Sequence, residues 1–155
     1  MARGQGAAGH HGAEAAPGLT LLVHDRLQAE AALAVEAELG LSILLAASAE
    51  LVRFVGPGYL VALGRLVGRP IALDCGAEPG TALAALRAGA RVLVLHPAAP
   101  RRDAVEQIAR RLGAELRPSL PAPVLALAPG EDAAAVLRAR LDGGAGPSSP
   151  RPRLV

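Results

Sequence analysis

The sequence predicts one α/β domain over residues 18–141, with a five-stranded, mostly parallel sheet and helices on both faces. Three observations support this fold class. Five short apolar runs show no alternation with polar residues, which is typical of strands buried on both sides. Segments with helical spacing of apolar residues separate these runs. Glycines end four of the helical segments at similar intervals, as repeated βα units require.

The strands come first in each predicted unit, and each is a short, continuous apolar run. Crossovers between such parallel strands are expected to be right-handed. The five predicted strands are LTLLV at 19–23, LSILLAA at 41–47, IAL at 71–73, VLVL at 92–95 and VLALA at 124–128.

Helical patterns fill the segments between the runs. In 101–112, apolar Val105, Ile108 and Leu112 recur at helical spacing, and Glu106 with Arg110 forms a favourable pair four residues apart. The other predicted helices are 26–39, 59–67, 79–88 and 131–141, with 48–55 as a short additional helix broken by Gly-Pro-Gly. The predicted helix exits, where a left-handed conformation is needed, are Gly40, Gly68, Gly89 and Gly113.

This pattern is similar to the three-layer sandwich of flavodoxin-like and Rossmann-like proteins. A partial (β/α) barrel is the alternative, since five units cannot close a full barrel. Residues 85–97, ALRAGARVLVLHP, resemble the last helix, turn and strand of response-regulator receiver domains, and the LRAGA turn is also similar to βα units of phosphate-binding barrels. The receiver Lys-Pro would correspond to His96-Pro97, and its phosphoacceptor aspartate would fall at Ala47 or Ser48. No family is assigned on this basis.

Both ends of the chain differ in composition from the alternating region. Residues 1–17 are Gly/Ala-rich, and residues 142–155 are rich in Pro, Gly and Ser. We expect both segments to be disordered tails.

Composition excludes several chemistries. All 16 basic residues are arginine, and the chain contains no lysine. Schiff-base aldolases, pyridoxal-phosphate enzymes and Walker-type P-loops each need a particular lysine, so these classes are excluded. The absence of Lys, Asn and Trp also suggests a GC-rich genome, and we expect a bacterial source.

The charge, the cysteine count and the apolar content predict the location of the protein and the kinds of partner it has. The net charge is +2, and Phe54 and Tyr59 are the only aromatic residues, so a nucleic-acid partner is not predicted. No apolar run approaches the ~18 residues of a membrane span. The single Cys75 fits a reducing compartment, and we expect a cytoplasmic protein. An apolar fraction of 52% suggests a homo-oligomer.

Open parallel sheets bind ligands at the carboxyl ends of their strands, which makes this edge the predicted site. Catalytic candidates there are Cys75 as nucleophile, His24 or His96 as base, and Asp74 or Asp25 as the residue orienting the base. The helix predicted to begin at Pro79 would lower the pKa of the Cys75 thiol. The alternative is that Cys75 is a small buried core residue, and this is the interpretation we favour.

Ligand-binding candidates at the same edge are Asp25, Ser48, Gly56, Gly58 and Gly76. Gly56-Pro57-Gly58 precedes a predicted helix, and such a turn presents backbone N–H groups to an anion. His24, Asp25, Asp74 and His96 share no metal-ligand spacing, so neither a metal site nor a particular cofactor is predicted.

The sequence therefore favours binding or sensing of a small anionic ligand, including a phosphorylated one. The alternatives are a small hydrolase or transferase and a non-catalytic homo-oligomeric assembly domain.

Overall fold

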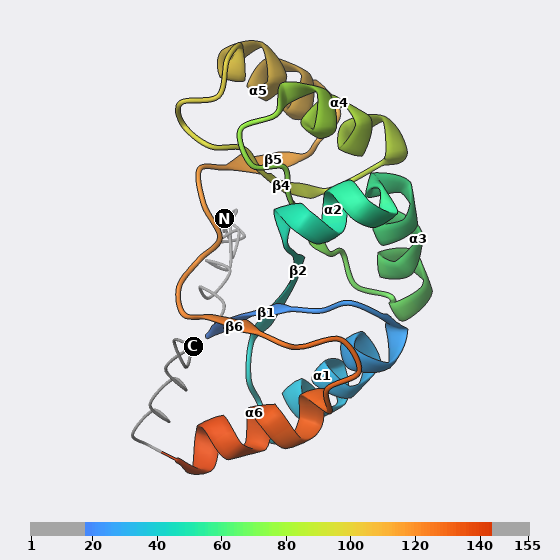
Figure 1. The fold of residues 1–155 in the computed structure, drawn as a ribbon, viewed down its shortest axis with the longest axis vertical. Coiled ribbons are helices and arrows are strands. Elements are labelled where there is room, and N and C mark those ends of the chain that lie inside the picture. Colours follow the sequence, from blue (N-terminus) through green and yellow to red (C-terminus); the bar gives the residue numbers. More distant parts are fainter. Residues whose placement is uncertain (1–17, 144–155) are drawn as a thin grey trace, which may run out of the picture.

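The computed structural model describes residues 18–143 (Figure 1). The two predicted tails lie outside this range, except for Asp142 and Gly143, which form the end of the last helix and its cap. Within the range the chain forms an α/β domain whose strands are all parallel, which confirms the predicted class. No helix within it is long and apolar enough to cross a membrane.

The sheet has six strands rather than the five predicted. Their order across the sheet is β5-β4-β3-β2-β1-β6. They are β1 (Leu19–Leu22), β2 (Ile43–Ala47), β3 (Ala72–Asp74), β4 (Val92–Val94), β5 (Glu115–Arg117) and β6 (Val124–Ala126). The additional strand is β5, whose sequence Glu-Leu-Arg carries only one apolar residue. It forms an edge of the sheet and keeps Glu115 exposed, so it lacks the apolar run by which the others were recognised.

The six helices follow the predicted segments closely. The helices 26–39 and 79–88 have the predicted bounds, and the predicted helix 59–67 begins two residues earlier, at Pro57. Side-chain oxygens of Asp25 and Ser48 accept from the first-turn backbone N–H groups of α1 and α2. The helices are α1 (Arg26–Leu39), α2 (Ala49–Val55), α3 (Pro57–Val67), α4 (Pro79–Ala88), α5 (Arg102–Arg111) and α6 (Ala133–Asp142).

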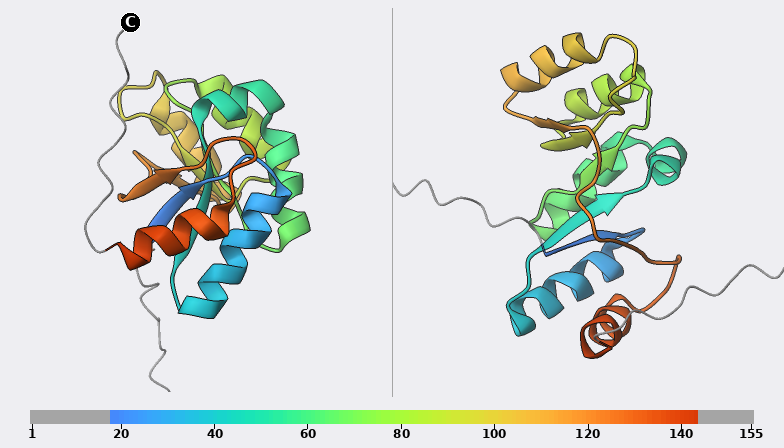
Figure 2. Two further views of the ribbon diagram at one scale, coloured as in Figure 1. Left: turned by 60° about the horizontal axis from the view of Figure 1, so that its bottom comes forward. Right: turned by 90° about the vertical axis from the view of Figure 1, so that its left-hand side faces the viewer.

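The helices pack side by side along the sheet. Strands β1 to β5 follow one another across the sheet in chain order. Because right-handed crossovers that always step in one direction place their helices on one face, helices α6, α1, α3, α4 and α5 contact one another in a single row. The row follows the outside of a curved sheet (Figures 1 and 2).

The opposite face of the sheet is crossed by the connection from β5 to β6, residues 118–123. Leu21 of β1 belongs to the core shared with the helices, so the adjacent Thr20 points the other way. Thr20 is nevertheless only 1% exposed, because its hydroxyl donates to the carbonyl of Pro121 at 2.7 Å and its amide donates to Pro123 at 2.9 Å. This connection therefore covers part of the face that the helix row leaves open.

The core is built from small aliphatic side chains. Leu21, Leu45, Leu73 and Leu93, from four neighbouring strands, are all fully buried and face the helix row. Alanines and valines of the helices complete the contact. Neither Phe54 nor Tyr59 takes part, because both lie at the surface.

Candidate functional site

The carboxyl ends of the strands meet at one edge of the sheet because every strand pair is parallel. His24 and Asp25 follow β1, Ser48 follows β2, and His96 follows β4 by two residues. Asp74 is the last residue of β3, and Cys75 and Gly76 come next. The structure thus brings the predicted catalytic candidates to one edge, although β2 lies between the strands that carry His24 and Asp74.

Three polar candidates at this edge hold local backbone structure. Asp25 and Ser48 cap α1 and α2. Asp74 accepts from the amide of Gly76 at 2.9 Å, which stabilises the turn after β3. In each of these side chains, one oxygen atom already accepts from a backbone amide. Only the remaining hydrogen-bonding capacity is available to a ligand.

The two histidine rings have different hydrogen-bond partners. The ring Nε2 of His24 lies 2.7 Å from the carbonyl oxygen of Leu127, at the end of β6. His96 is exposed, and its Nδ1 accepts from the amide of Ala98 at 3.1 Å. Each ring is therefore oriented by its own loop, and no hydrogen bond joins either ring to Cys75 within residues 18–143.

Sequence reasoning overlooked Gln28, the polar side chain most firmly fixed near this edge. It is 3% exposed, accepts from the His24 amide at 2.8 Å, and donates to the Ala128 and Glu131 carbonyls at 2.7 and 3.2 Å. It joins the β1–α1 turn to the β6–α6 turn. A glutamine in the first turn of a helix carries no signal of this role, since the two carbonyls to which it donates lie 100 and 103 residues away.

The glycine candidates contribute backbone geometry. Gly56, with φ of 84°, ends α2 and begins α3 without a side-chain cap. Gly58 is exposed in the first turn of α3. Gly76 accepts from the His96 amide at 2.7 Å, which fixes the loop after β4 against the loop after β3.

Cys75 is buried and weakly acidic. Its side chain is 3% exposed, and its Sγ lies 3.6 Å from the carbonyl oxygen of Leu73. Burial, together with the nearby charge of Asp74, raises the pKa of the Cys75 thiol to about 12. Since the thiolate is the nucleophile, this environment opposes catalysis by Cys75 and favours the structural interpretation.

We expect native Cys75 to react slowly with iodoacetamide at neutral pH and quickly after unfolding in urea, because both burial and the high pKa suppress the thiolate. Mass spectrometry of labelled protein over time measures both rates. The thiol of free glutathione under the same conditions gives the reference rate. Native labelling as fast as that of glutathione would contradict the structural role.

A small hollow of about 180 Å³ lies beside Cys75. It is bordered by Arg53 of α2, by Asp74, and by Glu78 and Thr81 at the start of α4. Arg53 lies 4.0 Å from Glu78 across it. Two carboxylates against one guanidinium make this hollow a poor site for an anion.

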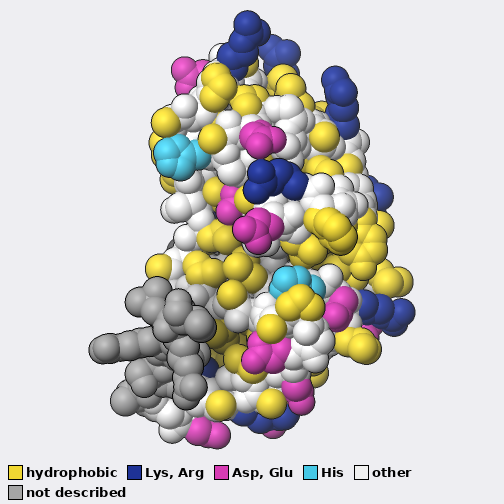
Figure 3. Space-filling view, viewed as in Figure 1, with side chains coloured by type: hydrophobic (Ala, Val, Ile, Leu, Met, Phe, Trp, Pro, Cys, Tyr) yellow, Lys and Arg dark blue, Asp and Glu magenta, His cyan; other side chains and the backbone are white. Residues whose placement is uncertain are grey.

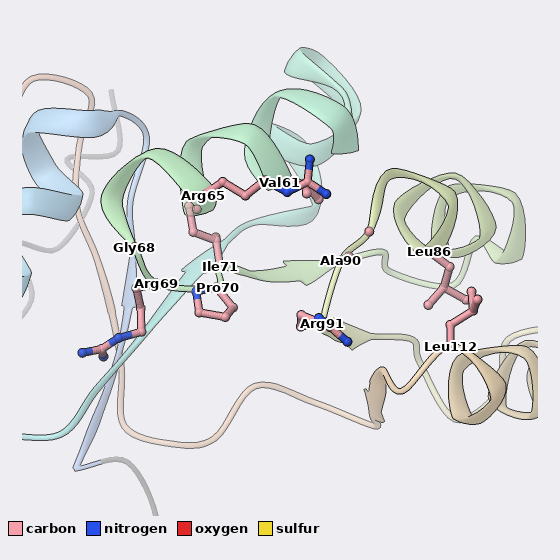
Figure 4. A pocket seen from close by; sticks show the side chains of 12 residues that line it. Val61, Arg65, Gly68, Arg69, Pro70, Ile71, Leu86, Ala90, Arg91 and Leu112 are labelled. Atoms are coloured by element: carbon pink, nitrogen blue, oxygen red, sulfur yellow. The ribbon is translucent and has the colours of Figure 1, made fainter.

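A larger cavity than this hollow lies at the opposite, amino-terminal edge of the strands (Figure 4). Its volume is about 530 Å³, within the range of small-ligand sites. It opens between the carboxyl ends of α3 and α4, the residues leading into β3 and β4, and the end of α5. Its lining residues are Val61, Gly64, Arg65, Gly68, Arg69, Pro70, Ile71, Leu86, Gly89, Ala90, Arg91 and Leu112.

Three arginines border this cavity, and they differ in whether a carboxylate pairs with them. Arg69 points away from the other two (Figure 4) and pairs with Glu36 at 2.6 Å. The hydrogen bond from Arg69 lowers the pKa of the Glu36 carboxyl below its usual value. The ion pairs among residues 18–143 include neither Arg65 nor Arg91.

Arg65 and Arg91 occupy different walls of the cavity. The Arg65 guanidinium lies against the end of α4, and its Nη2 donates to the Ala88 carbonyl at a long 3.4 Å. The Arg91 guanidinium reaches the end of α5, where its Nη1 would lie 3.6 Å from a Cβ at Gly113. This cavity could not be recognised from the sequence, because arginines near helix exits are common caps and the lining is spread over 52 positions from Val61 to Leu112.

Residues 18–143 contain no group of three or more His, Cys, Asp or Glu side chains placed to hold a metal ion. Comparison of the sequence with known family models and with curated proteins found no match. The chemistry of the cavity is therefore the main guide to function.

Proposed function

We propose that this protein binds a small ligand with an anionic group and an apolar body in the cavity at the amino edge of the sheet. The observation that carries this proposal is the combination of two arginines, Arg65 and Arg91, with an apolar wall around about 530 Å³. Neither arginine has a carboxylate partner among the described residues.

The chemistry of the lining defines the ligand class. A guanidinium presents five N–H donors in a planar fork that matches a carboxylate or a phosphate. Val61, Ile71, Leu86 and Leu112 offer apolar contacts next to it. A ligand with a carboxylate or phosphate and a short hydrocarbon or ring would satisfy both.

Charge favours this edge over the carboxyl edge predicted from the fold class. At the carboxyl edge, Asp74 and Glu78 surround Arg53 and would repel an anion. At the amino edge, the carboxylates of Glu36 and Glu115 are already paired, with Arg69 and Arg117. Arg65 also caps the end of α4, but one long hydrogen bond leaves most of its donors available.

The lining also favours binding without catalysis. It contains no Ser, Cys, Asp, Glu or His side chain, so no nucleophile or general base borders the cavity. A cytoplasmic location, which fits the single Cys75, remains part of the proposal.

Octanoate is a suitable probe because it combines a carboxylate with an apolar chain. We expect isothermal titration calorimetry to detect octanoate binding to the native protein. Arg65→Gln with Arg91→Gln should weaken it by roughly tenfold or more, since charge-assisted hydrogen bonds are lost. Arg87→Gln is the matched control, because Arg87 is an exposed arginine of α4 outside the cavity.

Two further probes separate the contributions of charge and tail. Acetate keeps the carboxylate, 1-octanol keeps the chain, and both should bind more weakly than octanoate. Octyl phosphate distinguishes a phosphate-selective site from a carboxylate-selective one. The proposal is overturned if neither octanoate nor octyl phosphate binds, or if binding is the same in the Arg65/Arg91 double variant.

A further inference from the structure

Both aromatic residues of the chain lie at the surface, close to one corner of the fold. Phe54, in the last turn of α2, is 88% exposed, and Tyr59, in the first turn of α3, is 50% exposed. They flank the turn at Gly56-Pro57. A protein whose core is built from Leu, Val and Ala thus leaves most of Phe54 and half of Tyr59 in water, where they remain available to a partner.

The exposed side of α3 continues this apolar surface. Tyr59, Ala62 and Leu66 recur at helical spacing, and Leu66 is 60% exposed. We call Phe54, Tyr59, Ala62 and Leu66 the α2–α3 face. Figure 3 shows hydrophobic side chains gathered over α2 and α3. Helical spacing places this face away from Val61, Gly64 and Arg65, which border the cavity, so the two sites are separate.

The charges beside the α2–α3 face indicate what covers it. Glu50 and Arg53 both lie exposed on α2, and Arg53 lies at a long 4.0 Å from Glu78, so the border carries both signs. An anionic membrane surface would favour a cluster of basic residues, and a strongly charged protein partner would favour a border of the opposite sign. In a two-fold contact between identical surfaces, an acid of one copy can face a base of the other when both lie on the same surface, and α2 provides both.

We propose that the α2–α3 face is the contact surface of a homodimer, with a second copy of this chain as its partner. Phe54 and Tyr59 form the centre of the contact, consistent with the enrichment of aromatic residues at interface centres. Glu50 and Arg53 of each copy lie at its rim and face the oppositely charged residues of the other copy. This proposal does not depend on a ligand in the cavity.

Sedimentation velocity at increasing protein concentration tests the proposal. We expect the native chain to dimerise. Phe54→Glu should raise the dimer dissociation constant by about tenfold or more, because it places a charge at the centre of the contact. Leu27→Glu is the matched control, since Leu27 is 77% exposed on α1 and lies outside the face. It should leave the dimer intact.

Circular dichroism of each variant establishes that it is folded, which the exposure of both side chains favours. A native chain that stays monomeric at the highest concentration reached would overturn the proposal. So would a dimer equally stable in Phe54→Glu, or one lost equally in Leu27→Glu. A monomer that floats with phosphatidylcholine vesicles and loses this binding in Phe54→Glu would assign the face to lipid and also overturn it.

Discussion

Replacing Gln28 by leucine should lower the free energy of unfolding by about 2–3 kcal/mol, because three backbone groups that bond to this buried side chain would lose their partner at once. The amide of His24 would lose its acceptor, and the carbonyls of Ala128 and Glu131 would lose a donor. Leucine has a similar size, so packing changes little. Urea denaturation followed by circular dichroism measures the loss.

Gln107→Leu provides the control for this prediction. Gln107 is exposed on α5, and the same replacement there should change the free energy of unfolding by less than about 0.5 kcal/mol. If Gln28→Leu were no more destabilising than Gln107→Leu, the polar connection between the two turns would not contribute to stability.

Gly64→Ala should also destabilise the protein, by about 1–3 kcal/mol, although alanine is the better helix former. A Cβ at position 64 would lie 2.9 Å from the backbone oxygen of Arg69 and 3.4 Å from the backbone nitrogen of Ile71. Since both are backbone atoms next to β3, α3 would have to move away from the sheet. Thermal or urea unfolding measures the effect.

Gly58→Ala is the matched variant in the same helix. No atom lies within 4 Å of a Cβ there, so only helix propensity acts and stability should rise by up to about 1 kcal/mol. Opposite signs for the two glycines would establish close helix–sheet approach as the reason for Gly64. A gain in stability at both positions would refute it.

The helices and inner strands could be predicted because their signals are local. α1 has an aspartate cap at Asp25 and a left-handed glycine at Gly40, and its bounds were predicted to the residue. The exit glycines Gly40, Gly68, Gly89 and Gly113 all have positive φ, as predicted. Strand β5 was missed because an edge strand with Glu115 and Arg117 needs no continuous apolar run.

The strand order, and the cavity that depends on it, could not be predicted from local signals. A set of βα units is compatible with helices on one face or both, and only the direction of each crossover decides between them. The same strand order brings Arg65 and Arg91 into one cavity although 26 residues separate them. The carboxyl-edge residues were placed together correctly, but their local hydrogen bonds to the backbone became visible only in three dimensions.

The pairing of β6 with β1 has a consequence for how the chain folds during synthesis. Strands β1 to β5 each add beside the previous one, so the sheet can grow in the order in which the ribosome delivers it. The outer edge of β1 stays unpaired throughout this growth, until Val124–Ala126 has emerged. An unpaired strand edge can associate with other chains. The pairing of β6 with β1 therefore removes the edge that has been exposed for the longest time during synthesis.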